Sequence, residues 1–127
     1  MTHDEPPRRA LILVDHGSRL AEANAVVAET ARQVQAKLGA GCEVRYAHME
    51  LAEPTLEQAI EAAVRAGVSE VVVQRFFLVP GRHASEDIPK LVDDARRRHP
   101  DVRFSLGEVL GPDPLLTELV LARARLR

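Results

Sequence analysis

The chain has 127 residues, of which 46% are hydrophobic and 28% are charged, and its formal net charge at pH 7 is −2. A chain of this length is normally one domain that folds without disulfides. The small acidic excess argues against a nucleic-acid partner, because nucleic-acid-binding domains are normally basic. Neither the polar start nor any later apolar run has the length of a secretion signal or a membrane span. Cys42 is the single cysteine and needs no oxidising compartment, so we expect a cytoplasmic protein without a membrane partner.

Short apolar runs alternate with segments of helical periodicity after a flexible polar tail at 1–9. A strand that is buried on both faces is a continuous apolar run, as in Ala10–Val14, whereas a helix repeats apolar residues three or four positions apart. Thr55 and Gln58 form a capping box, and Asp113 before Pro114 is a second helix start. We therefore expect strands at 10–14, 42–48, 70–77 and 102–106, and helices at 21–38, between Thr55 and Gly67, from near Asp87 (with Pro89 in its first turn) to His99, and from Asp113 onward, with a loop at 78–86.

This alternation predicts one α/β domain at 10–127. The expected architecture is a three-layer, doubly wound sheet of four mainly parallel strands in the order 2-1-3-4, similar to flavodoxin. In that order the connections after the first and third strands leave toward opposite faces. They open a crevice at the carboxyl edge of the sheet, and this crevice is where such folds bind ligands.

Two histidines fall at this predicted crevice. His16 follows the first strand, and His83 lies in the loop after the third. If the two strands are neighbours, both imidazoles project from the same edge, and the exit of the second strand adds Glu50. Two imidazoles and a carboxylate suit a divalent transition metal such as cobalt, nickel or iron. Histidine also suits proton removal near neutral pH.

The histidines also have structural interpretations. A histidine after a strand is commonly a loop residue held by a backbone contact. For His16 and His83, a functional role is favoured over this interpretation only because both are placed at one crevice. His48 ends a strand and fits a half-buried position. His3, in the tail, and His99, at a helix end, are expected to be solvated.

Other residues near the crevice are similarly open to two interpretations. Gly17 suits a sharp bend beside His16 and also an ordinary turn. Arginines there can pair with substrate carboxylates through two parallel hydrogen bonds, as for Arg19, although Arg75 fits a strand edge equally well. Phe76 is expected in the core, whereas Phe77 fits either the core or the floor of a site for a flat ligand.

Three segments resemble the class II chelatases, and most of all the short form of the sirohydrochlorin cobaltochelatase group. They are Asp15–Arg19, Glu50–Pro54 and Phe77–His83, the last continuing to Asp87–Pro89. A His-Gly-Ser tripeptide alone is weak evidence, but these segments occur in the right order, each at a predicted strand exit. The resemblance extends from about Ala10 to Leu126 and implies a chelatase-like version of the predicted fold.

The resemblance implies an enzyme that inserts a divalent metal, first of all cobalt and otherwise iron or nickel, into sirohydrochlorin for cobalamin or siroheme biosynthesis. His16 would be metal ligand and proton acceptor, and His83 the second ligand. The metal is a substrate, so no permanent cofactor is implied, and the short length implies a homodimer with a shared cleft. Asp15 departs from the family, in which glycine is commoner. The expected substrate-binding residues are Arg19, Glu50, Leu78, Val79, Pro80, Gly81 and Arg82.

Two other functions are compatible with the same residues. A non-catalytic carrier of metal or tetrapyrrole would use the same two histidines. A hydrolase would use Ser18 as nucleophile and His83 as base, but the G-x-S-x-G elbow is absent. A nucleotide-binding module is disfavoured further, because the first strand-helix turn lacks G-x-G-x-x-G.

Overall fold

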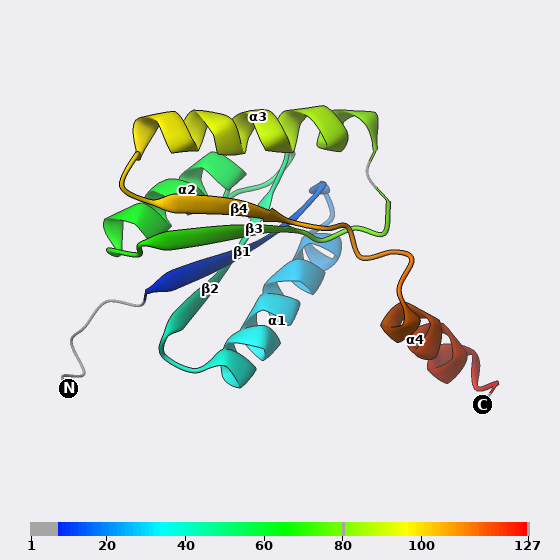
Figure 1. The fold of residues 1–127 in the computed structure, drawn as a ribbon. Helices are drawn as coiled ribbons and strands as arrows, with labels where there is room; N and C mark the ends of the chain where they lie inside the picture. Colours follow the sequence, from blue (N-terminus) through cyan, green and yellow to red (C-terminus); the bar gives the residue numbers. More distant parts are fainter. Residues whose placement is uncertain (1–7, 80, 127) are drawn as a thin grey trace.

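A parallel sheet forms the centre of the protein in the computed structural model, which describes residues 8–79 and 81–126 and omits the side chains of residues 82–85 (Figure 1). The strands lie in the order β2-β1-β3-β4, and every pairing is parallel, as predicted. The strands are β1 (Arg9–Asp15), β2 (Cys42–His48), β3 (Glu70–Arg75) and β4 (Arg103–Gly107), and the helices are α1 (Ala21–Leu38), α2 (Leu56–Arg65), α3 (Arg82–Arg98) and α4 (Pro114–Ala124).

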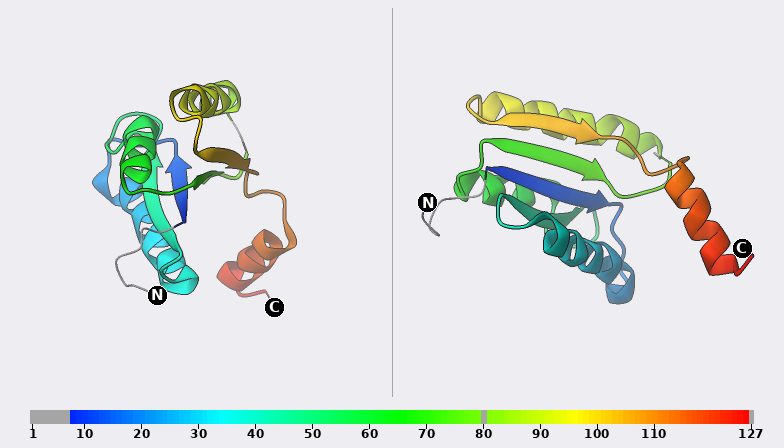
Figure 2. Two further views of the ribbon diagram at one scale, coloured as in Figure 1. Left: turned by 60° about the vertical axis from the view of Figure 1, so that its left-hand side comes forward. Right: turned by 60° about the horizontal axis from the view of Figure 1, so that its bottom comes forward.

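The helices cover the sheet from both sides. In Figures 1 and 2, α2 and α3 lie on one face and α1 lies on the other, against β1 and β2. The three-layer, doubly wound prediction is therefore confirmed. Because α1 and α3 leave toward opposite faces, the chain parts at the carboxyl ends of β1 and β3, which is the predicted place for a ligand.

The core is aliphatic and divided by the sheet. Ile12 on β1 is fully buried in the larger cluster beneath α2 and α3, together with Ile60 and Ile88. Its neighbour Leu13 points to the other face and packs with Val27 of α1 in a smaller cluster. Successive strand residues thus enter different clusters, which is why a strand covered on both faces is apolar at every position.

The predicted helix starts are confirmed where capping residues mark them. The Thr55 hydroxyl accepts a hydrogen bond from the Gln58 backbone N–H at 3.1 Å, and the Gln58 side chain accepts one from the Thr55 N–H at 2.8 Å. Asp113 accepts from the Leu115 N–H at 2.8 Å, with Pro114 as the first residue of α4. These side chains satisfy N–H groups that have no partner inside the helix.

The prediction for α3 was wrong in its start. The helix begins at Arg82 rather than near Asp87, so half of the expected loop is helical and Pro89 lies inside the helix rather than in its first turn. An interior proline removes one backbone hydrogen bond, and its ring crowds the carbonyl four residues before it, so it costs stability. Burial of Ile88 and Val92 offsets that loss. β3 also ends earlier than expected, at Arg75 rather than Phe77.

Helix α4 projects from the rest of the chain and has no buried residue (Figures 1 and 2). Two of its leucines are exposed, Leu115 at 81% and Leu119 at 48%. Among the described residues, no helix combines the length and apolarity needed to cross a bilayer.

Replacing Ile12 by alanine should lower the free energy of unfolding by about 3 kcal/mol, because the methyl groups lost leave a cavity in the closed cluster. Urea denaturation followed by circular dichroism measures the change. Leu115→Ala is the matched control, and at this exposed position we expect a change of at most about 0.5 kcal/mol. Equal losses in the two variants would contradict the assigned core.

Candidate functional site

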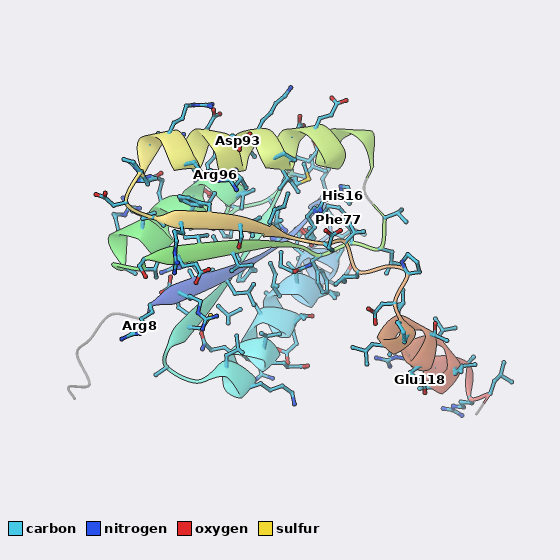
Figure 3. The ribbon with its side chains drawn as sticks, viewed as in Figure 1. Arg8, His16, Phe77, Asp93, Arg96 and Glu118 are labelled. Atoms are coloured by element: carbon cyan, nitrogen blue, oxygen red, sulfur yellow. The ribbon has the colours of Figure 1, made fainter. Side chains whose placement is uncertain are left out.

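His16 is the first residue after β1 and is exposed at the carboxyl edge of the sheet. Its ring stacks on Phe77, which follows β3, with ring centroids 4.5 Å apart and an angle of 29° between the planes. Figure 3 shows the two side chains next to each other where β1 and β3 end. The neighbouring strands thus hold an accessible imidazole in one orientation against an aromatic surface.

The loop that carries His16 is bound closely to the loop after β2. The Met49 N–H donates to the Asp15 carbonyl at 2.9 Å, and the Glu50 N–H donates to the His16 carbonyl at 3.2 Å. Gly17 has φ of +88°, and a Cβ there would overlap the carbonyl oxygen of Glu50 and lie 3.2 Å from the His48 Cβ. Only glycine fits both the conformation and the space. The interpretation of Gly17 as a bend is therefore confirmed.

Ser18 closes the same loop through backbone contacts. Its N–H donates to the Asn24 side-chain oxygen at 2.9 Å, and the Asn24 amide donates back to the Ser18 carbonyl at 2.7 Å. The Ser18 hydroxyl accepts from the Leu20 N–H at 3.0 Å. This hydroxyl stabilises the turn into α1, which argues against Ser18 as a nucleophile. The sequence analysis overlooked Asn24, although a polar amide in the first turn after a Gly-Ser loop is a typical turn-closing residue.

A cavity of about 270 Å³ lies beside His16 and is lined by Met49, Glu50 and Asp87 as well. His16 and Glu50 come from the loops after β1 and β2, and Asp87 comes from the second turn of α3. The cavity thus joins an imidazole, a thioether and two carboxylates at the carboxyl edge. These are ligand types that divalent cations accept, but in this structure the described side chains do not converge into a group that could hold a metal. The predicted proximity of His16 and Glu50 is confirmed.

The start of α3 also lies beside His16. A Cβ built on Gly81, the N-cap residue of α3, would be 3.7 Å from Cε1 of His16. Gly81 has φ of −71°, a value that any residue adopts. His83 is the second residue of α3 rather than a loop residue. The side chains of Arg82 and His83, and Pro80 as a whole, lie outside the described residues.

The remaining predicted residues fall into two groups. Arg19 is exposed, as are Leu78 and Val79, at 52% and 69%, which follow Phe77 toward α3. Arg75 instead donates from Nε to the Gly107 carbonyl at 3.1 Å and thereby joins β3 to β4. Phe76 packs against the smaller core cluster, as predicted.

Two other histidines are held by carboxylates. His48 is only 2% exposed, and its Nδ1 lies 2.6 Å from Oδ1 of Asp15. His99 was expected to be solvated, but its Nε2 lies 2.7 Å from Glu61 Oε2. The hydrogen bond from His99 is the main reason why the pKa of Glu61 is lowered. His99 therefore joins the C-terminal end of α3 to α2, whereas the cavity lies at the N-terminal end of α3.

No group of three or more histidine, cysteine, aspartate or glutamate side chains that could hold a metal is found among the residues whose side chains are described. The predicted metal pair, His16 and His83, therefore stays a prediction. His16 has the exposure and the fixed orientation that a ligand needs.

Residues 10–126 match the sequence model of the CbiX family. The chain is 42% identical over 110 residues to the chloroplastic sirohydrochlorin ferrochelatase of Arabidopsis thaliana, a match that covers 87% of this chain and 48% of the relative. It is 35% identical to the sirohydrochlorin cobaltochelatase of Methanopyrus kandleri, which covers 91% of this chain and 94% of that one.

Solved structures agree with these matches. The sirohydrochlorin chelatase from Bacillus subtilis subspecies spizizenii in complex with cobalt superposes with a TM-score of 0.84 at 31% identity, and covers 93% of this chain and 50% of the other. The chain thus spans about half the length of the plant and Bacillus proteins and nearly all of the archaeal one.

Gly17→Ala should destabilise the protein by more than Gly39→Ala, which is a control for backbone conformation alone. Both glycines have positive φ, but a Cβ on Gly39 meets no atom within 4 Å. We expect about 1 to 2 kcal/mol for the conformation alone, and a larger loss at Gly17, where the two loops must also separate. Chemical denaturation measures both, and equal losses would contradict the close approach of the loops.

Proposed function

The chain belongs to the CbiX family, and from this premise we propose that it inserts a divalent metal ion into the tetrapyrrole sirohydrochlorin. The names of the curated relatives, cobaltochelatase and ferrochelatase, support this reaction. The observation that carries the proposal is an exposed, oriented His16 above a carboxylate-lined cavity at the switch point of the sheet. We propose cobalt as the metal, with iron and nickel as alternatives, and a product used for cobalamin or siroheme.

The reaction exchanges one divalent ion for the two pyrrole protons of the free macrocycle. A neutral imidazole replaces a water ligand of the metal without adding charge, which eases its later release. Once the metal moves to the ring nitrogens, His16 has a free lone pair and accepts one of the two protons, and the other passes to solvent water. Glu50 and Asp87 line the same cavity, and their carboxylates favour entry of a cation.

His83 is the proposed second ligand. Its position along the chain supports this role, because Gly81 and Asp87 lie on either side of it and both are next to His16 or its cavity. A second imidazole at this point would hold the ion between two strand exits. Because His83 is in the first turn of α3, it would be carried by the helix rather than by a loop.

The macrocycle is proposed to lie over the exposed segment between β3 and α3. Leu78 and Val79 offer apolar surface beside the Phe77 ring, and a flat, largely apolar ring buries such surface favourably. Arg19 and Arg82 are the proposed partners of its carboxylates, and Pro80 and Gly81 complete the lining. The metal is a substrate in this scheme, and no permanent cofactor is proposed.

Turnover separates this enzyme from a carrier that uses the same histidines. Sirohydrochlorin is incubated anaerobically with cobalt, iron or nickel in parallel, with protein at about one-hundredth of the substrate, and the absorbance spectrum is followed. A chelatase converts many equivalents of substrate per chain. A carrier converts or retains only one equivalent of sirohydrochlorin per chain. If metal insertion is no faster with the protein than in buffer alone, both functions are refuted.

His16→Ala should lower kcat by at least about 100-fold, because the variant loses both a metal ligand and a proton acceptor. The exposed position predicts an unfolding free energy close to that of the wild type, so the loss is chemical. His99→Gln is the control, since this histidine pairs with Glu61 away from the cavity, and its kcat should stay within about twofold. Near wild-type turnover in His16→Ala would refute the assigned role.

A homodimer is part of the proposal, and α4 is its proposed contact. The helix exposes Leu115, Leu119 and Val120, and a groove beside it is lined by Val109 and Leu110. On the α1 side of the sheet, the described helices cover β1 and β2 and leave β4 open. A second copy of the chain would bury the apolar side of α4. A cytoplasmic location is likewise proposed, consistent with the single, reduced Cys42.

The double variant Leu115→Glu/Leu119→Glu should halve the mass measured by light scattering, because two buried charges on each copy oppose association. Leu38→Glu is the control, at the last residue of α1, where the leucine is 49% exposed against 48% for Leu119, and it should keep the mass of the wild type. A wild-type protein that is monomeric, or a double variant that keeps the wild-type mass, would contradict α4 as the contact.

A further inference from the structure

A hydrogen-bonded pair of polar side chains, Asp15 and the buried His48, adjoins His16 at the ends of β1 and β2, and the proposed mechanism gives it no role. His48 is 2% exposed, and its Nδ1 lies 2.6 Å from Asp15 Oδ1, whose side chain is 18% exposed. Asp15 immediately precedes His16. The two residues are register partners, the last of β1 and the last of β2, so the contact closes the end of this strand pair.

The two register pairs next to Asp15 and His48, Val14 with Ala47 and Leu13 with Tyr46, are apolar. A buried hydrogen-bonded pair gains little stability over apolar residues of the same size, because both groups lose water. It does impose one geometry, since a carboxylate accepts only from the ring N–H aimed at it. The pair therefore specifies a position more than it adds stability.

We propose that Asp15 and His48 are positioning residues that set the orientation of the His16 ring for metal transfer, an inference that rests on the proposed chelatase function. The path is short. The Nδ1–H of His48 holds the Asp15 carboxylate, and the Asp15 and His16 carbonyls accept from the loop that follows His48. With the Phe77 ring on its other side, His16 has its backbone and its ring face both fixed.

Matched amide variants test which atom carries the effect. His48→Asn places an N–H close to the position of Nδ1, whereas His48→Gln places it close to Nε2, and both lose the ring. Asp15→Asn keeps an oxygen acceptor, and Asp15→Leu removes it. We expect His48→Gln and Asp15→Leu to lower kcat by about 10-fold or more, and the two asparagine variants to stay within about threefold, since small displacements of a catalytic group cost this much. KM for sirohydrochlorin should not change, because its proposed surface is not altered.

A buried control excludes a loss that reflects stability alone. Val71 is fully buried on β3 opposite Ala10, at the end of the sheet away from His16. Val71→Ala should lower the melting temperature as much as the His48 variants while keeping wild-type kcat. If it loses kcat equally, or if His48→Asn loses as much as His48→Gln, the positioning role is refuted.

A second readout does not depend on activity. Nuclear Overhauser effects between the His16 and Phe77 rings report the 4.5 Å stacking directly. They should be present in the wild type and both asparagine variants, and weakened in His48→Gln and Asp15→Leu. If the wild type inserts no metal but His48→Gln and Asp15→Leu lose these contacts, the proposed function is refuted and the positioning role stands. Unchanged contacts in all four variants refute the positioning, whether or not metal is inserted.

Discussion

The close approach of the loops after β1 and β2 is the constraint on which the site depends. Two backbone hydrogen bonds join them, and the absence of a side chain at Gly17 lets the Glu50 carbonyl occupy the space where a Cβ would stand. This contact fixes the backbone at the carboxyl edge of the sheet. His16 is therefore exposed and yet keeps one orientation, two properties that a flexible loop does not combine.

In the proposed metal transfer, the rigid backbone around His16 and the exposure of its ring meet different needs. An ion must be accepted from water and given up again to a macrocycle, so a closed cage of ligands would hold it too firmly. At the edge described here, the loops after β1 and β2 and the second turn of α3 supply the groups that line the cavity, and His16 is exposed. The fixed backbone keeps the distances between these groups constant. Because the site is open, the pyrrole nitrogens of the proposed macrocycle would have room to approach.

The sequence predicted what local signals and strand order determine. The alternating periods gave the topology 2-1-3-4, and this order alone placed His16 and Glu50 at one edge. The capping side chains located α2 and α4. The start of α3 was predicted near Asp87, with Pro89 in the first turn, whereas the helix begins at Arg82. The direction of the His48 ring depends on Asp15, a contact between residues 33 positions apart that no local pattern encodes. The projection of α4 was missed for a related reason, since a sequence shows that a helix is apolar and not what it packs against.

The open geometry of the site has a consequence for metal selection in the proposed reaction. Relatives that are named for cobalt and for iron match the same stretch of this chain, so the shared fold and loops do not separate the two ions. Imidazole and carboxylate ligands bind divalent iron, cobalt and nickel with affinities that rise in that order, and an exposed site adds little geometric selection to it. Discrimination then has to come from the supply of each ion and from how fast the site releases it. In the proposed mechanism, release is the one of these two that the protein would control, through the orientation of His16.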